Sequence, residues 1–176
     1  MTRRLETERH DPIDMTAPTP APRIVLDTNV WLDLLLFDDP RAAPLRQALA
    51  NGEIVAVGNR ECRDEWLRVL RYPALGLDDA RRSALTEAYD ALLQPFDESA
   101  FAAETPADTA LPRCSDPDDQ KFLQLAHDAG ARWLISRDNH LLSLARRCRR
   151  EGLFEILTPE QWDPTRMRSA PPVGAT

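Results

Sequence analysis

The chain has 176 residues, of which 43% are hydrophobic, and a formal net charge of −7. This length can bury one ordinary hydrophobic core but hardly two, so we expect a single domain. The sequence contains no run of 18 apolar residues and no secretory signal, which predicts a cytoplasmic protein without a membrane segment. Cys62, Cys114 and Cys148 form no CxxC pair, and this spacing argues against a disulfide framework or a thiolate zinc site.

The negative net charge does not exclude a nucleic-acid partner. Lys121 is the only lysine, so almost all positive charge is arginine. Acids that bind a metal lower the net charge without abolishing phosphate affinity, because the bound cation inverts the local potential. The arginine cluster at residues 146–150 is interpreted as a solvated helix end rather than an RNA contact.

The first half of the chain alternates between strand and helix patterns. Residues 1–22 are rich in Pro, Thr, Arg and Glu without periodicity, and we expect a disordered leader. The apolar runs 23–27 and 54–57 predict buried strands. Asn59 can cap a helix that continues toward Tyr72, and residues 78–93 carry the apolar stripe of the next helix.

The second half continues the same alternation. Pro117 suits the first turn of a helix over 117–127, followed by a strand at 132–136. A helix over 139–149 and a strand at 154–157 follow, and residues 163–176 are expected to be a disordered tail. The alternation predicts an α/β fold over residues 23–162, with a central parallel sheet flanked by helices on both faces.

Acidic residues fall at the ends of the predicted strands. Asp27 ends the first strand, Asp138 follows the strand 132–136, and Asp116, Asp118 and Asp119 open the helix before it. In open α/β sheets the ligand lies beyond the carboxyl ends of the strands, so these acids are directed toward one edge. Carboxylates gathered there repel each other unless a cation is bound, and oxygen ligands select hard ions such as Mg²⁺ or Mn²⁺. Such a centre is suited to cleaving phosphodiesters.

The chain resembles a PIN domain in four stretches: IVLDTNVWLDLLL, NRECRDEWLRVLRYP, CSDPDDQKFLQLAHDAGARWLISRDNHLL and FEILTPEQW. The resemblance covers residues 23–162 and is strongest to the branch of toxins from toxin–antitoxin systems. It implies a PIN-like three-layer α/β/α fold and a Mg²⁺- or Mn²⁺-dependent endoribonuclease that hydrolyses RNA. It also implies a homodimer and a cognate antitoxin protein as partner.

The same resemblance assigns roles to individual residues. The catalytic and metal-binding acids of the family fall on Asp27, Glu65, Asp119 and Asp138. The supporting polar positions are Asn29 and Ser136, and Asp116 is a further candidate metal ligand. The fourth motif departs from the usual pattern because Arg137 stands where a small residue is common. Its side chain either contacts substrate phosphate or only biases the loop.

These assignments rest on unequal support. Strand-end position supports Asp27 and Asp138 without the resemblance, whereas Glu65 and Asp119 depend mainly on it. The acids at 116–119 also fit a plain interpretation, compensation of a helix dipole.

Two other classes of α/β protein fit the sequence less well. A haloacid-dehalogenase-like phosphatase needs an acid where Asn29 stands, and a receiver domain needs a lysine in an element other than that of Lys121. A catalytically silent PIN-like module that binds RNA or a protein remains the alternative.

Overall fold

The chain is described from a computed structural model, which covers residues 20–97 and 111–167. Five strands of these residues form one sheet, in the order β3-β2-β1-β4-β5, and every neighbouring pair is parallel. The strands are β1 (Arg23–Leu26), β2 (Val55–Gly58), β3 (Leu93–Pro95), β4 (Trp133–Ile135) and β5 (Glu155–Leu157). The first strand of the sequence therefore lies at the centre of the sheet.

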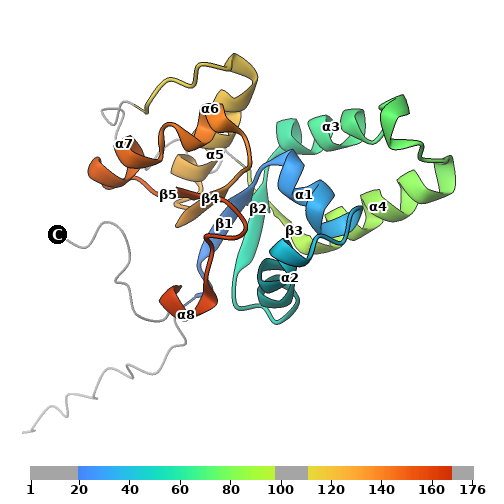
Figure 1. Ribbon diagram of the computed structural model, residues 1–176, viewed down its shortest axis with the longest axis horizontal. Helices are drawn as coiled ribbons and strands as arrows, with labels where there is room; N and C mark the ends of the chain where they lie inside the picture. Colours follow the sequence, from blue (N-terminus) through green and yellow to red (C-terminus); the bar gives the residue numbers. More distant parts are fainter. Residues whose placement is uncertain (1–19, 98–110, 168–176) are drawn as a thin grey trace, which may run out of the picture.

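Helices cover both faces of this sheet (Figure 1). The helices are α1 (Thr28–Leu35), α2 (Ala43–Ala50), α3 (Arg60–Val69), α4 (Asp79–Leu92), α5 (Gln120–Asp128), α6 (Asn139–Leu142), α7 (Ala145–Arg150) and α8 (Pro164–Met167). Among the described residues, 3₁₀ turns also form at η1 (Pro40–Ala42), η2 (Pro73–Leu75) and η4 (Pro117–Asp119). Core residues of α1, α2 and α4 pack on one face and those of α5 to α7 on the other, while α3 contributes Trp66 to the first core and Cys62 to the second.

The central strand shows why its sequence is a continuous apolar run. Ile24 and Leu26 enter the core beneath α1 to α4, whereas Val25 enters the core beneath α5 to α7. Successive side chains of a strand point to opposite faces, so a strand buried on both faces needs apolar residues at every position. The predicted three-layer α/β/α fold with a central parallel sheet is confirmed.

Predicted helix starts agree with the structure. Asn59 Oδ1 accepts a hydrogen bond of 3.0 Å from the backbone N of Cys62 and so caps α3. Asp116 precedes Pro117, the first residue of η4, and its carboxylate accepts from the backbone N of Asp118. Both caps satisfy backbone N–H groups that the first turn of a helix leaves without partners.

Three local predictions were wrong. Strand β3 was not predicted, and Leu93 was assigned to the preceding helix, because three residues ending in Pro95 at a sheet edge carry no alternation to detect. The helix predicted over 139–149 is divided into α6 and α7. Near the division Ser143 Oγ donates to the backbone oxygen of His140, a side-chain bond that competes with regular helix pairing.

The third correction concerns the chain end. Helix α8 (Pro164–Met167) lies within the segment 163–176, which was expected to be disordered. Its start is explained by Asp163, whose carboxylate accepts from the backbone N of Thr165 at 2.8 Å. The predicted leader lies mostly outside the described residues. Of the helices in the described parts of the chain, none has the length and apolar character to cross a membrane.

Candidate active site

The register of two central strands brings the first pair of candidate residues together. Strands β1 and β4 are neighbours, with Leu26 opposite Ile135, so Asp27 and Ser136 are the next residues of the two strands. The backbone N of Asp27 donates to the Ile135 oxygen at 3.0 Å, which carries the pairing one residue beyond Leu26. Both side chains are therefore placed at the carboxyl edge of the sheet by backbone pairing alone.

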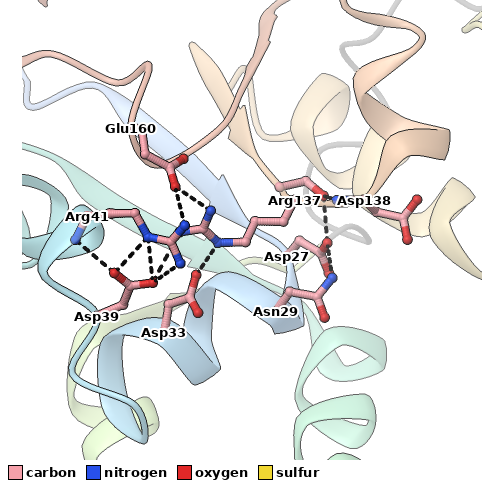
Figure 2. Close-up of polar contacts among 9 residues, drawn as sticks. Asp27, Asn29, Asp33, Asp39, Arg41, Arg137, Asp138 and Glu160 are labelled. Carbon is pink, nitrogen blue, oxygen red and sulfur yellow. Dashed lines mark hydrogen bonds and ion pairs between the residues drawn. The ribbon is translucent and has the colours of Figure 1, made fainter.

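Asp27 is buried, with only 3% of its surface exposed, and is held by two donors. Ser136 Oγ donates to Asp27 Oδ2 at 2.6 Å and Asn29 Nδ2 donates to the same oxygen at 3.1 Å (Figure 2). Burial raises the pKa of Asp27, the Ser136 hydrogen bond opposes this shift, and the nearby Glu65 charge adds to it. The roles expected of Asn29 and Ser136 as orienting residues fit these contacts.

Ser136 also connects Asp27 to the fourth acid. Its side chain is fully buried, and Ser136 Oγ accepts a hydrogen bond of 2.9 Å from the backbone N of Asp138. The Asp138 carboxylate caps α6 by accepting from the backbone N of His140 at 2.7 Å. One oxygen of Asp138 is thus used by the helix start.

Asp119 lies beside these acids, at the end of η4. Burial and the neighbouring charges of Asp27, Asp138 and Asp116 raise the pKa of Asp119 to about 6. No donor from the described residues reaches Asp119 Oδ2, although this oxygen is buried. This oxygen is therefore desolvated among like charges without a hydrogen bond to offset the cost.

Glu65 reaches the site from α3. Thr28 Oγ1 donates to Glu65 Oε1 at 2.7 Å, and the Lys121 ammonium pairs with Glu65 Oε2. The Glu65 charge contributes to the raised pKa of Asp27, so the two carboxylates are electrostatic neighbours. Both oxygens of Glu65 already have a donor.

The donor set fits a hard divalent cation. The group consists of carboxylate oxygens, and Asp119 offers an oxygen that is buried and without a donor. Within residues 20–97 and 111–167, however, no three His, Cys, Asp or Glu side chains stand as a ready-made ligand cage.

Arg137 does not point into this group. Its guanidinium pairs with Asp33 and Glu160 at 2.5 Å each and with Asp39 at 3.5 Å. Figure 2 shows Arg137 extending away from Asp138 toward these carboxylates. The phosphate-contact interpretation is not supported, and the interpretation that Arg137 acts on the loop fits its contacts.

Two contacting residues were missed by sequence reasoning. Thr28 and Lys121 contact Glu65 from α1 and α5, and neither was assigned a role in the site. The position of Lys121 two residues after Asp119, as the only lysine, was the available signal.

Comparisons with known proteins bear on the family. A model of the PIN domain matches residues 23–140, and no curated protein matches. A crystal structure of VapBC2 from Rickettsia felis, bound to a DNA fragment from their promoter, aligns at 12% sequence identity and a TM-score of 0.46. The alignment covers 80% of this chain and 99% of that one. Because the family match extends over most of the chain and contains every candidate site residue, the chain belongs to the PIN domain family.

Proposed function

We propose that the protein is a metal-dependent endoribonuclease whose active site contains Asp27, Glu65, Asp119 and Asp138. The observation that carries the proposal is the buried Asp119 Oδ2, which accepts no hydrogen bond from the described residues and lies among the charges of Asp27 and Asp138. Such an arrangement costs stability unless a cation offsets it. Carboxyl groups whose pKa is shifted by burial and by neighbouring charges cluster at functional sites.

The chain's own residues would do two things. Asp27, Asp119 and Asp138 would hold Mg²⁺ or Mn²⁺, with Asp116 as a further candidate. Ser136 and Asn29 fix the rotamer of Asp27, so its carboxylate is oriented before the substrate arrives. When bound, such an ion supplies Lewis acidity at a phosphodiester.

A cleavage assay tests this proposal. Purified protein is incubated with structured and single-stranded RNAs in Mn²⁺, Mg²⁺ or EDTA, beside Asp27→Asn and Asp138→Asn. We expect cleavage only with the metals and at least a roughly 100-fold loss in either variant. Asp64→Asn is the matched control, because Asp64 precedes Glu65 on α3 but is exposed and pairs with Arg60.

The control should cleave like the wild type. A wild-type protein that cleaves no RNA better than Asp27→Asn does would contradict the enzyme assignment and leave a silent binding module.

We further propose that the protein is the cytoplasmic toxin of a toxin–antitoxin pair and acts as a homodimer. The support is the resemblance of the LDTN, DEWLRVL and SRDNHLL stretches to that branch of the family. Expression of the wild type should arrest growth, expression of Asp27→Asn should not, and the product of a neighbouring gene should relieve the arrest. Equal growth of the two strains would exclude the toxin role.

A further inference from the structure

The only lysine of the chain lies beside the candidate active site. The chain has 22 Lys and Arg residues in total, and 21 of them are arginine; position 121 alone is lysine. The Lys121 side chain is only 9% exposed, and its ammonium pairs with Glu65 Oε2 and donates to the Asp118 backbone oxygen at 2.6 Å. The Glu65 carboxylate and the Asp118 carbonyl oxygen thus hold the Lys121 amine in place as an ion-paired ammonium.

The carboxylates of the site differ in how well they are satisfied. Glu65 accepts from Thr28 on one oxygen and pairs with Lys121 on the other. Asp119 Oδ2, in contrast, is buried with no donor among the residues that the structure describes. The demand for an added cation is thus concentrated at Asp119 and its neighbours, away from Glu65.

The residue type at position 121 suits the role of a cation. An ammonium is a compact point charge, whereas the guanidinium of arginine is a broad planar fork. A chain that uses arginine at every other basic position has lysine where a small charge must fit between a helix and a carboxylate.

We propose that the Lys121 ammonium takes the place of a second metal ion, so that the protein binds one divalent cation through Asp27, Asp119 and Asp138. The inference rests on the proposed function for the presence of a metal. It replaces the expectation that Glu65 is a metal ligand. Glu65 instead forms a fixed ion pair with Lys121 and acts on the site through its charge and its hydrogen bond with Thr28.

Counting bound Mn²⁺ tests this inference without an activity assay. Titration of the metal-free wild type, followed by calorimetry or by electron paramagnetic resonance of the free ion, should saturate at one Mn²⁺ per chain. Asp119→Asn should lose this ion. Two ions per wild-type chain of similar affinity would overturn the inference.

A double variant tests whether the Glu65–Lys121 ion pair takes part in binding the divalent cation. Glu65→Gln with Lys121→Met removes two opposite charges together and leaves neutral side chains of similar size, an exchange that proteins often tolerate. We expect one Mn²⁺ per chain with an affinity within about threefold of the wild type. Loss of the ion in a double variant with wild-type circular dichroism would overturn the inference.

The RNA assay keeps the two proposals distinct. A wild type that binds one Mn²⁺ but cleaves nothing would contradict the nuclease function while leaving the single-ion inference intact. A wild type that cleaves RNA and binds two ions would support the nuclease function and overturn the single-ion inference.

Discussion

At the residue scale, Asp119 combines a functional role with a cost to the fold. The folded protein raises the pKa of Asp119 to about 6, above its ordinary value of 3.8. The folded state therefore holds the proton more tightly than the unfolded chain does, and ionised Asp119 destabilises the metal-free protein above about pH 6. The cost shrinks as the pH falls from 6, and it disappears below 3.8, where Asp119 is protonated in both states.

Asp119→Asn should accordingly be more stable than the wild type at pH 7.5 in EDTA. We expect a gain of about 1–2 kcal/mol, once solvent screening of the partly exposed carboxyl is allowed for. Chemical denaturation at pH 7.5 and pH 4.5 measures it, and the difference between the two proteins should shrink to about a third at the lower pH. A variant less stable than the wild type at both values would show that the charges of the site are already compensated.

The second prediction at the residue scale concerns the hydroxyl of Ser136. Its buried hydroxyl donates to Asp27 and accepts from the backbone N of Asp138, so Ser136→Ala removes both bonds. We expect Mn²⁺ affinity to fall by about 10- to 100-fold, the usual effect of losing a hydrogen bond to a metal ligand. Calorimetric titration measures the affinity, with Ser83→Ala on the exposed surface of α4 as control. Equal affinities in the two variants would remove Ser136 from the site.

Single residues differ in how far the sequence could place them. An apolar run followed by an acid predicted that Asp27 and Asp138 follow two strands of a parallel sheet, and the structure has them after β1 and β4. The pairing of Glu65 with Lys121 was not predictable, since the two residues lie 56 positions apart on different helices. Only the packing of α3 against α5 brings them into contact.

At the element scale, ion pairs that lie outside the candidate site hold the turn between β4 and α6. Ser136 contacts Asp27 and the backbone N of Asp138. Arg137, between Ser136 and Asp138, pairs instead with Asp33 of α1 and with Glu160 after β5 (Figure 2). Glu160 also pairs with Arg41, and Asp39 accepts from Arg41 through both carboxylate oxygens. Anchoring of the turn to α1 and to the segment after β5 thus restrains its neighbours Ser136 and Asp138.

Arg137→Met should therefore destabilise the protein through Asp33, which is only 9% exposed and would lose its partner. We expect a loss of about 1–3 kcal/mol in the free energy of unfolding. In a double-mutant cycle, adding Asp33→Asn to Arg137→Met should cost less than the sum of the single changes, by about 1 kcal/mol or more. Urea denaturation provides the four values, and strict additivity would contradict the coupling.

Elements with strong periodicity were predictable and short ones were not. The buried strands and the capped helix α3 follow from apolar runs and from Asn59, and the structure confirms them. Edge strand β3 gains its pairing only from β2, so its three residues carry no local signal. The strand order, which places β1 beside β4, is likewise set by tertiary packing, and it is what brings Asp27 to Ser136.

At the scale of the whole molecule, the site and the fold draw on the same carboxylates. Asp27 joins the central strand to α1, and Asp138 caps α6, so acids that would bind the metal also lie at element boundaries. A cation that binds only the folded state stabilises it by mass action. At a Mn²⁺ concentration 100 times the dissociation constant, the gain is about 2.7 kcal/mol, or roughly 5–10 °C in Tm for a domain of this size.

Thermal unfolding of the full chain in EDTA and in increasing Mn²⁺ measures this gain. The wild type should show a Tm that rises with the logarithm of the Mn²⁺ concentration, whereas Asp119→Asn should begin with a higher Tm in EDTA and stay constant. The two curves should therefore cross, because the substitution removes both the repulsion and the ligand. Parallel curves would mean that Mn²⁺ binds elsewhere on the surface, and they would separate the acid cluster from any metal-dependent activity.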